Sequence, residues 1–172
     1  MRKFIKKISL FILFSSLFYL IVLFVWASYL PDAFKPNINY RIGSYGHSFS
    51  RLKEVEQAKD VDIVFVGSSH AYRGFDPRIF KKEGFSCFNL GSGSQTPFQT
   101  KLLLDRYLDQ LNPHVLVYEV YPATFTLDGV ESAVDLLSNG KIDEYSIEMA
   151  WDINHLKVIR RCFMLQSVSF LI

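Results

Sequence analysis

A glycine and three polar residues follow an apolar run near the middle of the chain, and their types and order favour nucleophilic chemistry. The run, residues 61–66 (Val-Asp-Ile-Val-Phe-Val), is rich in β-branched side chains and predicts a buried parallel strand. It ends at Gly67, where glycine permits a sharp turn. Ser68, Ser69 and His70 therefore follow the carboxyl end of a strand, the edge at which open α/β sheets hold ligands. A serine at this edge is placed to attack a carbonyl carbon.

Two further apolar segments and one helical segment predict the elements around these residues. Residues 86–90 predict a second strand that ends in a Gly-Ser-Gly-Ser loop at 91–94. Residues 114–120 predict a third strand, apolar enough to be buried on both faces. Between them, Thr96 and Pro97 are typical of a helix start, and leucines at helical spacing continue to Leu111. Strands that alternate with helices predict an α/β fold with a parallel sheet.

The first thirty residues predict a membrane anchor. Four cations within residues 2–7 precede an apolar stretch at 8–30. About 23 residues at about 1.5 Å each give roughly 34 Å, enough to cross a bilayer core of about 30 Å. A cleaved signal peptide usually has an apolar region of only about 7–15 residues, so a retained transmembrane helix in the cell membrane is expected. Since a basic flank stays in the cytoplasm, the single-pass topology places the N-terminus there and the bulk of the chain outside it.

The charge balance and the cysteines exclude several classes of function. Without the four cations of the flank, 15 basic residues stand against 17 acidic ones, so no basic patch is left to bind nucleic acid. The two cysteines, Cys87 and Cys162, predict buried thiols rather than a disulfide. No cluster of residues has the spacing of a zinc site, and we expect no metal.

The chain is expected to have three parts. Residues 1–30 form the basic flank and the anchor, and residues 31–60 form a stalk, because prolines, asparagines and glycines interrupt any long period there. A short charged helix is expected over 51–59, just before the first strand. Residues 61–172 form the α/β domain.

The glycine and serine segments resemble the motifs of the SGNH (GDSL-like) hydrolases. Gly67, Ser68 and Ser69 are similar to the first block of that family, Gly-Asp-Ser, in which the last serine is the nucleophile. The resemblance implies that Ser69 is the nucleophile, with Ser68 in place of the usual aspartate. Residues 89–96 (Asn-Leu-Gly-Ser-Gly-Ser-Gln-Thr) are similar to the second block, in which a glycine donates a backbone N–H to the oxyanion. The implied oxyanion donors are Ser69 and Gly93, with Gly91 as the alternative glycine.

The similarity covers roughly residues 61–122 and is greatest to the membrane-anchored branch that modifies cell-envelope polymers, such as the alginate O-acetyltransferase group. It implies a flavodoxin-like three-layer sandwich, incomplete in this chain, after one N-terminal transmembrane helix. No Gly-x-Asn-Asp block follows the third strand, although the family usually has one there. Only three strands precede residue 152, whereas such a sheet has about five. The chain is therefore expected to be the N-terminal portion of a longer protein.

The last family block, Asp-x-x-His, has one match, Asp152 to His155. In one interpretation His155 takes the proton from Ser69 while Asp152 orients the imidazole, as in a serine triad. In the other, the two residues are a weakly interacting surface pair on a helix. The residues alone leave both open, and the position of the motif, before a fourth strand, favours the second.

Three further residues lie near the predicted nucleophile. His70 follows Ser69 directly, so its side chain is expected to point away from the Ser69 hydroxyl and to contact substrate or support the structure rather than act as a general base. Arg73 is expected either to bind an anionic or sugar-bearing group or to be solvated. Glu119, an acidic residue at the end of the third apolar run, is expected to pair with Arg73 or His70.

The expected function is that of a membrane-anchored, extracytoplasmic serine acyl-esterase or O-acyltransferase that needs no cofactor. Its expected partners are the bilayer through residues 8–30, a carbohydrate or acylated polymer of the cell envelope as substrate, and a partner membrane acyltransferase. The alternative is a catalytically inactive, membrane-tethered scaffold of the same fold that binds envelope polysaccharide.

Overall fold

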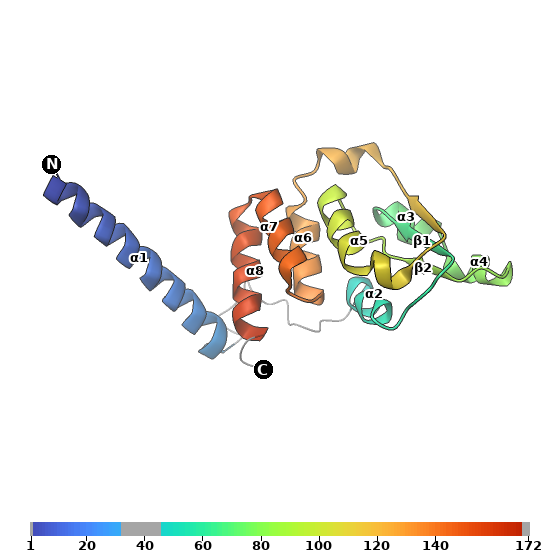
Figure 1. Cartoon of the computed structure of the whole chain (residues 1–172), viewed down its shortest axis with the longest axis horizontal. Coiled ribbons are helices and arrows are strands. Elements are labelled where there is room, and N and C mark those ends of the chain that lie inside the picture. Colours follow the sequence, from blue (N-terminus) through green and yellow to red (C-terminus); the bar gives the residue numbers. More distant parts are fainter. Residues whose placement is uncertain (1, 32–45, 170–172) are drawn as a thin grey trace. The chain divides into compact units, whose positions relative to one another are not determined.

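The computed structural model describes residues 2–31 and 46–169. The chain divides into two units, Met1–Asn39 with Phe163–Ile172, and Tyr40–Cys162. The described elements, in chain order, are α1 (Arg2–Tyr29), α2 (His47–Val55), β1 (Ile63–Val66), α3 (Ser69–Gly74), α4 (Pro77–Lys82), β2 (Cys87–Asn89), α5 (Pro97–Leu111), β3 (Val115–Tyr118), the 3-10 helix η2 (Pro122–Thr126), α6 (Val130–Asn139), α7 (Glu144–Ile153) and α8 (Leu156–Ser169) (Figure 1).

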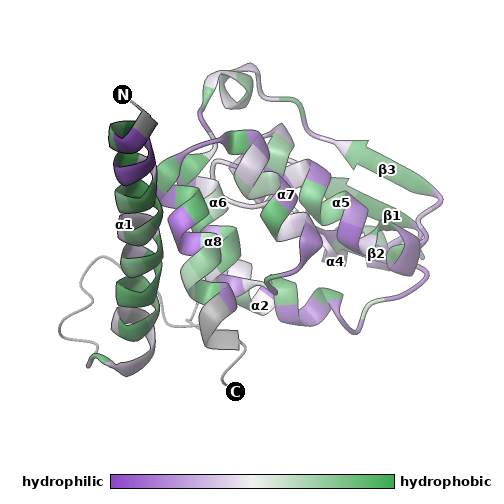
Figure 2. Ribbon diagram, turned by 60° about the vertical axis from the view of Figure 1, so that its left-hand side comes forward, coloured by the Kyte–Doolittle hydropathy of each residue, from purple (hydrophilic) through white to green (hydrophobic). Residues whose placement is uncertain are grey.

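α1 is long and apolar enough to span a membrane over Lys3–Trp26. Its large apolar side chains are exposed, and it is coloured hydrophobic along most of its length in Figure 2. An isolated helix cannot keep so much apolar surface in water, so this surface needs a covering medium or partner. A signal sequence near an N-terminus can meet the same criteria of length and apolar composition.

The sheet is a small parallel one of three strands in the order β2-β1-β3. Val64 of β1 lies opposite Phe88 of β2 on one side and Leu116 of β3 on the other. The three predicted strands are thus confirmed, together with their parallel direction. β1 forms the centre of the core, because Val64, Phe65 and Val66 are almost completely buried.

β3 is exposed, and the prediction that it is buried on both faces is wrong. Val115, Leu116 and Tyr118 expose 49%, 42% and 39% of their surfaces, although the strand is apolar in Figure 2. β3 is an edge of the sheet, and among the described residues only β1 pairs with it. Apolar composition shows that a strand can be buried, whereas burial itself needs neighbours on both sides and both faces.

The helix after the second strand begins and ends as its residues predict. Thr96 and Gln99 form a capping box at the start of α5, and Pro97 occupies the first turn. α5 ends at Asn112, whose φ of 42° is left-handed and stops the helix. Its apolar face is buried at Leu103 and Tyr107.

Helices α6 and α7 pack against α5 and form the helical part of the unit Tyr40–Cys162 (Figure 1). Arg106 of α5 is one polar link between α5 and α7, since its guanidinium lies 2.6 Å from Asp143, the N-cap of α7. The same guanidinium donates to Ser146. Leu137 of α6 and Met149 of α7 are buried.

α2 lies within the segment 31–60 predicted as a stalk, and it packs against α6. Leu52 and Val55 are buried, and the Ser48 hydroxyl donates to Asp135 of α6 at 2.6 Å. The helix spans His47–Val55 rather than the predicted 51–59. Residues 47–55 therefore contribute to the folded unit, and residues 32–45 of the predicted stalk lie outside the described part.

Candidate functional site

The predicted serines lie where the sheet changes direction. From β1 the chain moves to β2 on one side and then returns to β3 on the other, so the change of direction falls between β1 and β3. Parallel α/β sheets bind ligands at such a point, beyond the carboxyl ends of the strands. The residues that follow β1 and β3, Ser68 to His70 and Glu119 to Tyr121, meet there.

Glu119 holds the turn after β1 through Ser68. Its Oε2 atom accepts one hydrogen bond from the backbone N–H of Ser68, at 2.9 Å, and another from the Ser68 hydroxyl, at 2.7 Å. Glycine is required at position 67, because φ is +137° and a Cβ there would lie 2.8 Å from both Cβ and Oε2 of Glu119. Glu119 was expected to pair with Arg73 or His70, but its hydrogen bonds within the described residues go to Ser68 instead.

Ser69 is the first residue of the short helix α3, and Ser68 is its N-cap. The Ser68 hydroxyl accepts from the backbone N–H of His70 at 3.2 Å, which fixes the start of the helix. Within the described residues the backbone N–H of Ser69 has no hydrogen-bond partner. The side chain of Ser69 is half-buried, and among the described residues no group hydrogen-bonds its hydroxyl. Both groups are therefore available to a ligand.

The two candidate glycines of the second loop have different roles. Gly91 is packed against α3, since a Cβ would lie 2.9 Å from that of Ala71, and its N–H already donates to Asn89 Oδ1 at 2.9 Å. Gly93 is exposed, with nothing within 4 Å of an added Cβ, and its N–H has no partner among the described residues. The Ser92 N–H donates to Gly67 O at 3.2 Å and holds this loop beside the turn. Gly93 thus keeps the N–H that an oxyanion site needs.

His70 is exposed but held at two points. Its Nδ1 atom lies 3.1 Å from the Ser68 hydroxyl oxygen. Its ring packs on Tyr121, with the ring centroids 4.5 Å apart. Tyr121 follows β3 by three residues, so this contact links the ends of β1 and β3 a second time. The histidine ring is consequently presented to solvent in a fixed orientation.

Arg73 lies at the exposed end of α3 and interacts with its own helix. Its Nε donates to the Tyr72 hydroxyl at 3.2 Å, and its guanidinium carbon lies 5.4 Å from the centre of the Tyr72 ring. Tyr72 in turn stacks on His47 of α2, with centroids 4.3 Å apart. The guanidinium keeps free donors toward solvent, as a substrate-binding role requires.

Asp152 and His155 lie in a different part of the fold. Asp152 is on α7 and His155 is in the turn that follows it, and α5 lies between α7 and α3 in Figure 1. Both residues are exposed, and among the described residues no hydrogen bond joins either of them to the other or to Ser69.

The Nδ1 atom of His155 accepts from the backbone N–H of Lys157 at 3.2 Å. In a neutral imidazole this places the proton on Nε2, opposite to the arrangement in a serine triad. The geometry favours the interpretation of a surface pair, while the base assignment stays a prediction.

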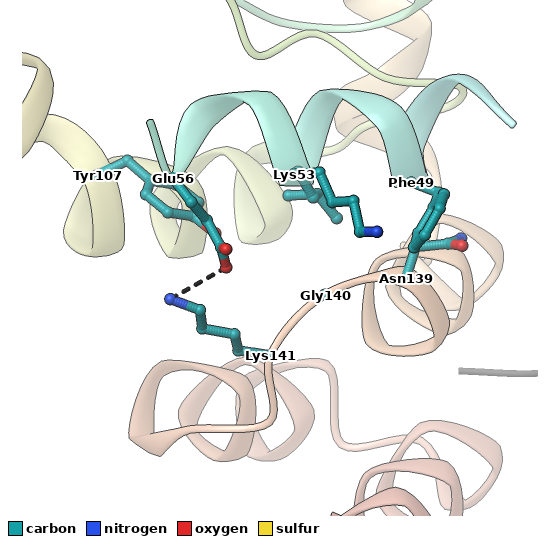
Figure 3. Close-up of a pocket in the computed structure, with 8 residues that line it drawn as sticks. Phe49, Lys53, Glu56, Tyr107, Asn139, Gly140 and Lys141 are labelled. Carbon is teal, nitrogen blue, oxygen red and sulfur yellow. Dashed lines mark ion pairs between the residues drawn. The ribbon is translucent and has the colours of Figure 1, made fainter. Parts of the chain in front are cut away.

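A surface pocket of about 310 Å³ lies between α2 and the turn that joins α6 to α7. Phe49, Lys53 and Tyr107 line it, and Lys141 forms an ion pair of 3.1 Å with Glu56 across one end (Figure 3). None of the predicted site residues lines this pocket. The ammonium of Lys53 lies 4.8 Å from the centre of the Phe49 ring, so both lysines of the pocket interact with other lining residues.

Asp76 and the two cysteines have shifted pKa values. Arg78 beside Asp76 lowers the pKa of that carboxyl to about 2, which stabilises the cap of α4. Burial raises the pKa of the thiols of Cys87 and Cys162, both of which are free. Among the described residues, no three His, Cys, Asp or Glu side chains are grouped so that they could hold a metal ion.

Comparisons of the chain with models of protein families, with curated proteins and with solved structures find no match.

Proposed function

We propose that this protein is a membrane-anchored serine acyl-esterase or O-acyltransferase that acts outside the cytoplasm on a carbohydrate or acylated polymer of the cell envelope. The observation that supports it best is the position of Ser69 beyond the carboxyl ends of β1 and β3, directly after a buried strand and a constrained turn. Its free backbone N–H lies beside a loop that offers a second free N–H, that of Gly93. A nucleophile next to such donors is the arrangement that acyl transfer requires.

In the proposed reaction the Ser69 oxygen attacks the carbonyl carbon of an acyl ester and forms an acyl-enzyme. The N–H groups of Ser69 and Gly93 stabilise the oxyanion, and one such donor typically contributes about 3 kcal/mol in the transition state. Water then releases the acyl group, or a sugar hydroxyl accepts it. Arg73 and His70 are proposed to contact the substrate, and a partner membrane acyltransferase is proposed to supply the acyl group.

We further propose that the sheet belongs to a flavodoxin-like three-layer sandwich. The order β2-β1-β3 equals the first three positions of the flavodoxin-like order 2-1-3-4-5. Because right-handed crossovers run in opposite directions from β1 to β2 and from β2 to β3, they put α3 and α4 on one face and α5 on the other. The exposed edge of β3 is where the next strand of such a sheet would pair.

The proposed membrane topology depends on α1 and its flank. Four cations precede the apolar residues of α1, which favours a cytoplasmic N-terminus and an external remainder. N-terminal sequencing of the protein isolated from membranes tests retention of α1. An intact start at Met1 supports the anchor, whereas a start beyond Leu30 contradicts it and indicates a cleaved signal.

Labelling with a fluorophosphonate tests the proposed nucleophile in the detergent-solubilised full chain. We expect labelling of the wild type and its loss in Ser69→Ala, because the probe forms a covalent bond only with an activated serine. Ser50→Ala, on the exposed surface of α2, is the matched control and is expected to label normally. Equal labelling of Ser69→Ala and the wild type would rule out Ser69. Loss in His155→Ala as well would assign the base to the Asp152–His155 pair.

A catalytically inactive scaffold that binds envelope polysaccharide is the second candidate. It is favoured by the fact that, among the described residues, no side chain hydrogen-bonds the Ser69 hydroxyl. A folded wild-type chain that binds polysaccharide in a pull-down but never reacts with the probe would support the scaffold.

A further inference from the structure

The carboxylate of Glu119 determines where the hydroxyl proton of Ser68 lies. A carboxylate only accepts hydrogen bonds, and Oε2 of Glu119 accepts from Ser68 twice, from the backbone N–H and from the hydroxyl. The hydroxyl has a single proton, and at 2.7 Å that proton is donated to Glu119. The Ser68 oxygen can therefore act only as an acceptor toward any other group.

This assignment fixes the tautomer of His70. The Ser68 oxygen lies 3.1 Å from His70 Nδ1 and also accepts the backbone N–H of the same residue. Because the oxygen has no further proton to give, Nδ1 must carry the proton of a neutral ring. Nε2 then has a free lone pair. The packing of Tyr121 on the ring fixes its plane, so this lone pair has a defined direction on an exposed side chain.

We propose that Glu119 and Ser68 are positioning residues that hold His70 as the proton acceptor of the site. The proposal depends on the acyl-transfer function proposed above. It names a hydroxyl-bearing acceptor, water or a carbohydrate alcohol, because a free lone pair accepts a hydroxyl proton and repels a carboxylate or phosphate oxygen. His155 has the opposite tautomer, since its Nδ1 accepts from Lys157.

The proton follows a balanced path in the second half of the reaction. The acceptor oxygen forms a bond with the acyl carbon of acyl-Ser69 while its proton passes to Nε2 of His70. The bond between that carbon and the Ser69 oxygen then breaks. The imidazolium returns the proton to the departing Ser69 oxygen, which restores the free enzyme and leaves a carboxylic acid or a new ester.

The first measurement is the tautomer of the His70 ring, which can be determined whether or not the protein has enzymatic activity. We would record long-range ¹H–¹⁵N spectra of the full chain in detergent, with the ring signals of His70 assigned from His70→Gln. The expected result is a proton on Nδ1 in the wild type and its loss from that atom in Ser68→Ala and in Glu119→Met. Asp76→Ala is the matched control, because it removes the same kind of helix cap from α4 and leaves the Glu119–Ser68–His70 contacts intact.

The second measurement is the steady-state rate of p-nitrophenyl acetate hydrolysis. Loss of a general base costs about 10²- to 10⁴-fold in rate, so His70→Gln, Ser68→Ala and Glu119→Met should slow the steady-state rate by about this factor. Asp76→Ala should keep the wild-type rate.

Three results would overturn the positioning role if the probe still labels Ser69. The first two are a proton on Nε2 of His70 in the wild type and an unchanged tautomer in Ser68→Ala. Loss of labelling in His155→Ala but not in His70→Gln would do the same. An Nδ1 proton in a chain that the probe never labels would instead overturn the proposed acyl transfer, and the proton-acceptor role with it.

Discussion

Gly67→Ala should be among the most destabilising single-methyl changes near the site, and the structure separates two reasons for it. An alanine Cβ would lie 2.8 Å from Cβ and Oε2 of Glu119 and 2.9 Å from its backbone oxygen. Crowding of this kind typically costs about 1–3 kcal/mol in a packed region. The φ of +137° adds strain of about 1–3 kcal/mol for a residue with a side chain. We therefore expect a loss of about 2–6 kcal/mol in the free energy of unfolding.

Two other glycines serve as matched controls for this change. Gly84 also has a positive φ, +90°, but has nothing within 4 Å of an added Cβ, so Gly84→Ala contains the strain without the crowding. Gly74→Ala contains neither and should be neutral or stabilise by about 0.4–1 kcal/mol, because alanine restricts the unfolded chain. The difference between Gly67→Ala and Gly84→Ala then measures the close approach of Glu119.

The assay is urea unfolding of the full chain in detergent, followed by far-UV circular dichroism and analysed with one shared slope. The expected order of stability is Gly74→Ala, then Gly84→Ala, then Gly67→Ala. Equal stability of the last two would refute the reasoning, since it would mean that Glu119 does not pack over Gly67. Fluorophosphonate labelling of Gly67→Ala should also decrease, because the displaced carboxylate no longer holds the turn.

Three other measurements test the remaining structure. Asn89→Ala should cost about 2–4 kcal/mol of unfolding free energy in the same assay. The buried amide donates to two carbonyls, one of α3 and one of its C-cap residue, and accepts from Gly91, so its loss leaves buried groups unpaired. Asn89→Asp keeps the size of the side chain but cannot donate, so it should cost nearly as much, and a neutral result for either variant would contradict the role of the amide. Burial raises the pKa of Cys162 from 9.0 to about 11, so the unfolded chain loses this proton first and the free energy of unfolding should fall as pH rises from about 9 to 11. Cys162→Ala should make the free energy of unfolding fall less steeply with pH over this range. An unchanged pH dependence would contradict the prediction. Replacement of three leucines of α1 by aspartate should release the chain from carbonate-washed membranes, whereas retention would show that another segment binds the membrane.

Much of the fold follows from local patterns of the sequence. The β-branched run at 61–66 predicts β1, and Thr96 with Pro97 predicts the start of α5, because each signal depends on neighbours within a few residues. The length of the apolar segment near the N-terminus predicts α1 for the same reason. The start of α2 at His47 was not predicted, because its helical pattern depends on burial of only two residues, Leu52 and Val55, against α6.

The sequence by itself also determined that a serine follows a glycine at the end of the first strand. Only the tertiary structure decided what that serine turn contacts. The partner of Ser68 is Glu119, 51 residues later, and it comes close because β1 and β3 pair in parallel and end at the same edge. The tautomer proposed for His70 depends on the contacts of Ser68 with Glu119 and His70, and that of His155 depends on the backbone N–H of Lys157. The exposure of β3 depends on which strands lie beside it. Hydrogen-bond direction and burial are properties of neighbours in space, and residue types along the chain do not specify them.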